Sequence, residues 1–288
     1  MNDMSKPRAL TVLSLLAVLT LTARFARAED DPPPPAAASA ATAQDDDDAA
    51  LQPAEPDFRL INLPTTLRLP KFKSDFFLSH RFAGNLRRGS FGDQAGHLFG
   101  IDEGATIGFE YRFAIAKHLE LAAYRTNFGR TIQIYGKYDA IHQHESIPLS
   151  GSLIVSTEGT DNLQQDYAPA IGLTISRLIN EVAAVYVVPT FVHNSAAVTG
   201  LDRDTTFLGV GGRLRFRPTA YLVVEVSPRL SGYAPGRALY GFAIEKRAGG
   251  HVFQLNFTNG VGTTPAQIAR GGQRDQLALG FNLSRKFY

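Results

Sequence analysis

Strict alternation of apolar and polar residues recurs in short segments from about Lys73 to the end of the chain. In one such segment, residues Leu279, Phe281 and Leu283 alternate with Gly280, Asn282 and Ser284. A period of two residues is typical of a β-strand whose two faces meet different surroundings. No window offers the roughly 18 uninterrupted apolar residues of a membrane-spanning helix. The pattern therefore predicts an all-β fold with no spanning helix.

The number and spacing of these segments favour a closed barrel. We predict an antiparallel, up-and-down transmembrane β-barrel of about twelve strands, near residues 73–82, 103–113, 118–127, 130–139, 147–157, 167–178, 182–193, 204–217, 220–229, 239–247, 251–258 and 275–287. Short and long links take turns between them, as in outer-membrane barrels with short periplasmic turns. In such a barrel the apolar faces meet lipid and the polar faces line the lumen.

The first 28 residues have the pattern of a secretory signal peptide. Two bases, Lys6 and Arg8, precede an apolar stretch over residues 9–23, and a small-x-small site ends at Ala28. The apolar stretch is too short to favour a spanning helix. We expect cleavage after Ala28 and export to the bacterial outer membrane.

Residues 29–57 are rich in Pro, Ala and Asp and carry nine acids and no Lys or Arg. Such a segment has too few apolar residues to offset the entropy of ordering, so we expect a disordered periplasmic linker. Its acidic charge could recruit a basic periplasmic partner. The barrel domain is expected to span residues 58–288.

Aromatic residues provide two further expectations. The chain has 19 Phe and 10 Tyr but no Trp, so Tyr would supply an interfacial girdle near strand ends. The candidates are Tyr111, Tyr124, Tyr138, Tyr186, Tyr221 and Tyr240. The last strand ends in Phe287 and Tyr288, an aromatic ending of the kind that barrel-insertion machinery recognises.

Basic residues on polar strand faces point to the chemistry of the lumen. Arg213, Arg215 and Arg217 share one face of a strand, and Glu225 lies on a neighbouring strand. The full candidate set for a basic ladder in the lumen is Arg81, Arg112, Lys137, Arg213, Arg215, Arg217 and Glu225. Rings of Arg and Lys favour anions in a pore. The alternative is a salt-bridge network that fills a narrow barrel.

The long link 83–102 is expected to fold over the mouth of the barrel. Its candidate residues are Asp93, His97, Asp102 and Glu103. The absence of Cys excludes disulfides and thiolate metal sites. His142 and His144 share one side of a strand but lack a third convergent ligand, so we predict neither a metal nor a cofactor.

Three motifs, in order along the chain, carry a family resemblance: Ser79-His80-Arg81-Phe82, then residues 98–105, then Tyr124-Arg125-Thr126 through Lys137-Tyr138. From about Leu63 to its end the chain resembles a family of bacterial outer-membrane β-barrel proteins described only as a domain of unknown function. The resemblance implies an exported β-barrel. It implies no activity and no catalytic residues.

Three hypotheses for function remain open. The first is a passive pore for small, mildly anionic solutes, with outer-membrane lipid as its surroundings. The second is a plugged docking barrel whose acidic tail binds a periplasmic partner. The third is a lipid-modifying enzyme, which the missing Gly-x-Ser-x-Gly elbow disfavours, so we predict no enzyme. The spread of basic residues along alternating strands also disfavours a nucleic-acid partner.

Overall fold

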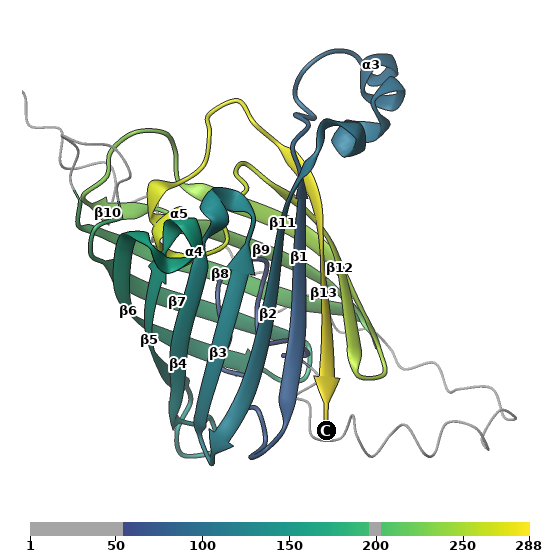
Figure 1. Cartoon of the computed structure of the whole chain (residues 1–288). Helices are drawn as coiled ribbons and strands as arrows, with labels where there is room; N and C mark the ends of the chain where they lie inside the picture. The colour runs from purple at the N-terminus through teal and green to yellow at the C-terminus, as the bar shows by residue number, and fades with distance from the viewer. Residues whose placement is uncertain (1–53, 196–202) are drawn as a thin grey trace, which may run out of the picture. The chain divides into compact units, whose positions relative to one another are not determined.

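The computed structural model describes residues 54–195 and 203–288, which fall in one compact unit of residues 46–288. The expected signal peptide and residues 29–53 of the expected linker lie outside these residues. The strands in the described part of the chain form a single antiparallel sheet that closes on itself (Figure 1). The chain is therefore a β-barrel, as the alternation predicts.

Within the described residues the barrel is built from twelve successive strands, of which one is interrupted. They are β1 (Ser74–Phe82), β2 (Ala105–Ala116), β3 (Leu119–Thr126), β4 (Ile132–Ile141), β5 (Ser150–Gly159), β6 (Gln165–Ile179), β7 (Ala183–Val192), β8 (Thr205–Arg217), β9 (Ala220–Ser227) with its continuation β10 (Arg229–Ser231), β11 (Leu239–Ala248), β12 (His251–Thr258) and β13 (Ala278–Phe287). Pro228 separates β9 from β10, and both pair with β8. Proline has no N–H to donate to the ladder, which accounts for the interruption.

Each strand pairs with its neighbour in sequence, and the first pairs with the last. Ser74 of β1 lies opposite Phe287 of β13, and this pairing closes the sheet. The expected strands are confirmed: each overlaps one of the observed strands, with bounds that differ by at most three residues. The local alternation was sufficient because it is a property of the strand itself.

The two ends of the barrel differ in their links. One end, called here the short-turn end, carries links such as 117–118 and 218–219 and the barrel's own first and last residues. The other, the long-loop end, carries 83–104 and 259–277. Short helices lie in the long links: α3 (Phe91–Gly96), η1 (Leu98–Glu103), η2 (Phe128–Arg130), α4 (Thr160–Leu163) and α5 (Pro265–Arg270). Among the described helices none has the length and apolarity to cross a bilayer.

Burial in this barrel is inverted relative to a soluble domain. Large apolar side chains of the strands are exposed on the outer face, including Phe109, Leu121, Ile134, Leu173, Phe242 and Leu255. Charged side chains are buried on the inner face, including Arg81, Glu110, Arg112, Lys137, Arg213 and Glu245. A continuous exposed apolar band needs a non-aqueous surrounding, and a bilayer supplies it.

Candidate functional site

Residues 54–69, called here the plug, occupy the inside of the barrel and precede β1. Nearly all of them are buried, although they belong to no strand of the barrel (Figure 1). The plug folds back on itself in a tight turn, where the Leu60 N–H donates to the Leu63 carbonyl at 2.8 Å and the Thr65 N–H to the Phe58 carbonyl at 2.9 Å. Residues 54–57 were expected to be disordered linker, and this part of the expectation is wrong because the lumen supplies their partners.

Glu225 on the inner face of β9 holds the tip of the plug. Its carboxylate accepts the backbone N–H groups of Ile61 and Asn62 at 3.0 Å and of Leu63 at 3.1 Å. It also accepts the Asn62 side-chain amide at 2.8 Å. Several charge-assisted hydrogen bonds to one buried carboxylate make a strong and directional anchor. Glu225 was expected beside the basic ladder; it binds backbone donors of the plug instead.

An ion-pair network joins the plug to β2, β3 and β4. Arg59 of the plug pairs with Glu110, which also binds Arg112 at 2.8 Å. Arg112 pairs with Glu120 at 3.1 Å. Lys137 pairs with Asp139 at 3.1 Å and donates to the Leu67 carbonyl of the plug. Arg59, Arg112 and Lys137 are thus each matched by a carboxylate, as burial of charge requires.

Two acids of the expected linker are also bound in the lumen. Tyr186 donates its hydroxyl to Glu55 at 2.8 Å, and the Thr66 N–H donates to the same carboxylate at 2.9 Å. The Ser284 hydroxyl donates to Asp57 at 3.0 Å. The acidic segment therefore ends inside the barrel.

Two glycines of β8 make room for the apolar tip of the plug. A Cβ atom at Gly209 would lie 2.6 Å from Leu63 Cδ2, and one at Gly211 would lie 2.5 Å from Leu60 Cδ1. Carbon atoms do not approach so closely, so a side chain at either position would force the Leu63 or Leu60 side chain to shift. At these two positions the shortest contacts come from Leu63 and Leu60 of the plug.

The loop between β12 and β13 enters the barrel from the opposite, long-loop end. Its segment 263–270, called here the cap, contains α5, in which four consecutive residues from Ala266 to Ala269 are buried. Glu158 accepts the Thr264 hydroxyl at 2.7 Å and the Ala266 N–H at 3.0 Å. Apolar residues of the plug and the cap belong to one cluster, which includes Leu63 and Ile268.

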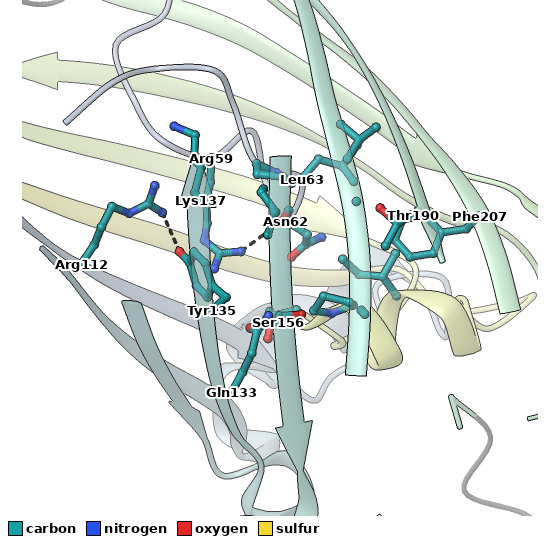
Figure 2. A pocket seen from close by; sticks show the side chains of 18 residues that line it. Arg59, Asn62, Leu63, Arg112, Gln133, Tyr135, Lys137, Ser156, Thr190 and Phe207 are labelled. Atoms are coloured by element: carbon teal, nitrogen blue, oxygen red, sulfur yellow. Dashed lines mark hydrogen bonds between the residues drawn. The ribbon is translucent and has the colours of Figure 1, made fainter. Parts of the chain in front are cut away.

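A cavity of about 60 Å³ remains between the plug, the cap and the wall (Figure 2). Arg112, Tyr135 and Lys137 lie on one side of it, and Thr190 and Phe207 on the other. The Arg112 guanidinium donates to the Tyr135 hydroxyl at 2.9 Å. The cavity therefore has a cationic side and a largely apolar side.

Four of the six basic residues expected to form a ladder lie inside the barrel. Arg81, Arg112, Lys137 and Arg213 are buried on the inner face. Arg213 pairs with Glu245 at 3.0 Å, and Arg81 donates to Asn282 at 2.8 Å. The arrangement is a mixed ion-pair network rather than a basic ladder. Arg215 and Arg217 do not extend it: β8 has an irregular register there, Arg215 approaches Glu181 at 3.7 Å near the rim, and Arg217 is exposed.

The girdle prediction is wrong for three of its six tyrosines. Tyr124, Tyr186 and Tyr221 are buried on the inner face. Tyr221 alternates in phase with Glu225, so the strand period already places it on the polar side. Tyr111 and Tyr138 are exposed on the outer face, and Tyr240 is half-buried and accepts a hydrogen bond from Arg87. For these three the girdle remains a prediction.

The link 83–104, called here the arm, stands away from the barrel instead of covering the mouth (Figure 1). Helix α3 has no buried residue, and the candidates Asp93, His97, Asp102 and Glu103 are exposed. Hydrogen bonds from the Ser90 backbone N–H and hydroxyl hold the pKa of Asp93 below its usual range. No cluster of three or more metal-ligating side chains occurs within the described ranges.

Sequence reasoning missed the plug, the cap and their anchors Glu225 and Glu158. The plug has no alternation, so residues 54–57 were assigned to the linker and residues 58–69 to the barrel domain without a structural role. One signal was available, namely the apolar tip Leu60-Ile61-Asn62-Leu63 next to an acidic tract, in a region too irregular for a strand. Nothing local connects that tip to Glu225, which lies 164 residues away from Ile61.

Solved structures of outer-membrane proteins resemble this chain at low identity. A triple mutant of Rh. blastica porin is 11% identical, with a TM-score of 0.35 over 63% of this chain, and the chain spans 55% of that porin's length. The KdgM porin is 8% identical, with a TM-score of 0.49, covering 75% of this chain and 99% of its own. An outer membrane channel from Pseudomonas putida F1 is 10% identical, with a TM-score of 0.45, covering 76% and 97%.

No curated protein matches the chain significantly. A family model described as a membrane bound beta barrel domain matches residues 56–287, which include all but the first two residues of the plug, the barrel wall and the cap. The expected resemblance, which began near Leu63, is confirmed and extends a few residues further toward the N-terminus. The chain belongs to this family of membrane-bound β-barrel domains, DUF5777.

Proposed function

We propose that the chain is an outer-membrane channel for small polar solutes that the plug holds closed. The observation that supports this is the nature of the wall beneath the plug, which carries buried charged side chains such as Arg112, Glu120 and Arg213. Such a wall becomes a hydrophilic lumen once the plug leaves. The passive-pore hypothesis is thereby refined, because conduction requires withdrawal of the plug.

The contacts of the plug are of a kind that water can replace. A hydrogen bond to a charged group, such as those that Glu225 accepts from the plug, contributes about 1.5–3 kcal/mol net when water can replace it. Its apolar tip adds roughly 1.5–3 kcal/mol for each of the buried side chains of Leu60, Ile61 and Leu63. The balance favours the closed state, so opening requires a competing partner or an applied force that acts on the plug.

A disulfide between plug and wall tests this proposal. Thr66 Oγ1 and Ser176 Oγ lie 2.5 Å apart, and the chain has no native Cys. The double variant Thr66→Cys/Ser176→Cys should be electrically silent in planar bilayers when oxidised and should recover wild-type openings when reduced. Each single variant is the matched control and should not respond to reductant.

Deletion of residues 54–66 provides the complementary measurement. The deleted chain should conduct continuously, because the polar wall then faces water. A deleted barrel that is folded but silent, or an oxidised double variant that conducts as the wild type does, would contradict the proposal.

The docking-barrel hypothesis is a second candidate, supported by the position of Glu55 and Asp57 inside the lumen. A basic periplasmic partner that captured the acidic tail would compete with Tyr186 and Ser284 for these carboxylates and would draw the plug outward. Addition of a basic peptide to the short-turn side should then raise the open probability, whereas an acidic peptide of equal length should not.

A further inference from the structure

The cavity between the plug and the cap has an unusual charge lining. Three cationic side chains, Arg59, Arg112 and Lys137, line it. Among the described residues that line the cavity there is no Asp or Glu. The carboxylates of Glu110 and Glu120, which pair with these cations, are not among the lining residues, so the charged groups that line the cavity itself are all basic.

Two donors on side chains that line this cavity have no acceptor. The Nε–H groups of Arg59 and Arg112 are buried and have no hydrogen-bond partner within the described part of the chain. The Arg112 side chain is only 2% exposed, so bulk water does not replace the missing acceptor. A buried charged donor without an acceptor is costly, and an anionic oxygen in the cavity would remove that cost.

The opposite side of the cavity has a different chemistry. Val188, Phe207 and Ile268 present apolar side chains there. A volume of about 60 Å³ accommodates roughly four to six water-sized groups, since one water needs about 10–15 Å³ by this measure. The fitting ligand therefore has an anionic head and a short apolar tail of one or two carbons.

We propose that this cavity binds a short-chain monocarboxylate of the size of acetate. The carboxylate meets the guanidinium groups of Arg59 and Arg112, and the methyl group faces Val188 and Phe207. The inference rests on the proposed function, because it places an occluded solute between the plug and the cap. It also gives Arg59 a role in selectivity, since the plug itself then supplies part of the binding site.

Equilibrium dialysis of the full chain in detergent against radiolabelled acetate at neutral pH tests the proposal. We expect saturable binding of one acetate per chain that excess chloride or acetamide does not displace. Acetamide has the shape of acetate without its charge, so it separates charge recognition from filling of space. Competition by acetamide equal to that by unlabelled acetate would overturn the proposal.

Two variants locate the site. Arg59→Gln should weaken acetate binding by at least about tenfold, because a hydrogen bond to a charged group is lost. Ala170→Leu, which fills the cavity without touching a charge, should abolish binding. The matched control is Lys71→Gln, which removes an exposed positive charge just after the plug and should bind as the wild type does.

A disulfide assay distinguishes loss of the ligand site from loss of the plug. With Thr66 and Ser176 both changed to Cys and oxidised, the disulfide holds the plug in place in the Arg59→Gln background, so weaker acetate binding there reports the ligand site and not plug docking. Absence of acetate binding in the wild type, or wild-type binding by both cavity variants, would overturn the inference. Neither result would affect the conductance test of the plug, so the two proposals fail separately.

Discussion

The plug and the cap enter the same lumen from opposite ends and are held in different ways. The plug is bound through charged groups, with Glu225 at its tip and Arg59 in the ion-pair network. The cap is bound through a few hydrogen bonds to Glu158 and through the apolar side of α5. The cap is tied at both ends, to β12 and β13, whereas the plug joins β1 through residues 70–73.

This difference in attachment suggests a difference in mobility. A loop fixed at both ends moves little when one contact is lost, so its response is local. In the proposed channel the plug acts as a tethered ligand, whose docking is a single equilibrium that each contact biases. Changes to the plug should therefore alter the closed population, while changes to the cap should alter local exchange.

Glu225→Gln should have the largest effect. Loss of the charge that accepts the turn N–H groups weakens docking by about 1.5–3 kcal/mol. That corresponds to a rise of roughly 10- to 150-fold in the ratio of withdrawn to docked plug. Single-channel recording measures it as open probability. Glu181→Gln removes an exposed acid and is the control; equal behaviour of the two variants would refute the role of Glu225.

Gly209→Ala should have the next largest effect, because its new Cβ atom overlaps with Leu63. Overpacking of this kind costs about 1–3 kcal/mol. The second change Leu63→Ala should recover part of the loss, since it removes the atoms that clash. The rate of disulfide formation between Cys residues at positions 66 and 176 reports docking. Strictly additive effects of the two changes would show that Leu63 does not occupy this position.

Glu158→Gln should loosen the cap and leave the plug in place. The lost hydrogen bonds at Thr264 and Ala266 are worth about 0.5–1.5 kcal/mol each. Hydrogen exchange at the Ala266 amide should accelerate, while the open probability stays at its wild-type value. A strong rise in conductance would mean that the cap, rather than the plug, closes the channel.

Asp93→Asn in the arm should have the smallest effect, confined to helix α3. Asp93 and Ser90 form a reciprocal capping box there. Because the pKa of Asp93 is lowered in the folded arm, its contribution is present above the usual carboxyl range and is lost as the pH falls through the lowered value. Proteolysis within residues 85–103 should be faster in the variant than in the wild type, and faster in the wild type once the pH falls below the lowered pKa of Asp93. The conductance should be unchanged in both cases.

The outer face of the barrel could be predicted in detail because the alternation that produces it is a property of each strand by itself. In β12 and β13 the alternation sets both the strand bounds and the lipid-facing phase, and Phe287 continues that phase. Tyr124 and Tyr186 were misplaced because position near a strand end was given more weight than strand phase. Phase decides which face a side chain occupies, and proximity to a strand end does not.

By itself the sequence determined that the chain forms a membrane barrel of twelve strands, because side-chain period and apolar content act residue by residue along each strand. Only the tertiary structure decided what fills that barrel. The plug meets Glu225, Gly209 and Gly211 across more than a hundred residues of chain, and such contacts leave no periodic trace in the sequence. The contents of the lumen therefore follow from long-range contacts of the fold, whereas the membrane-facing surface follows from the residue pattern within each strand.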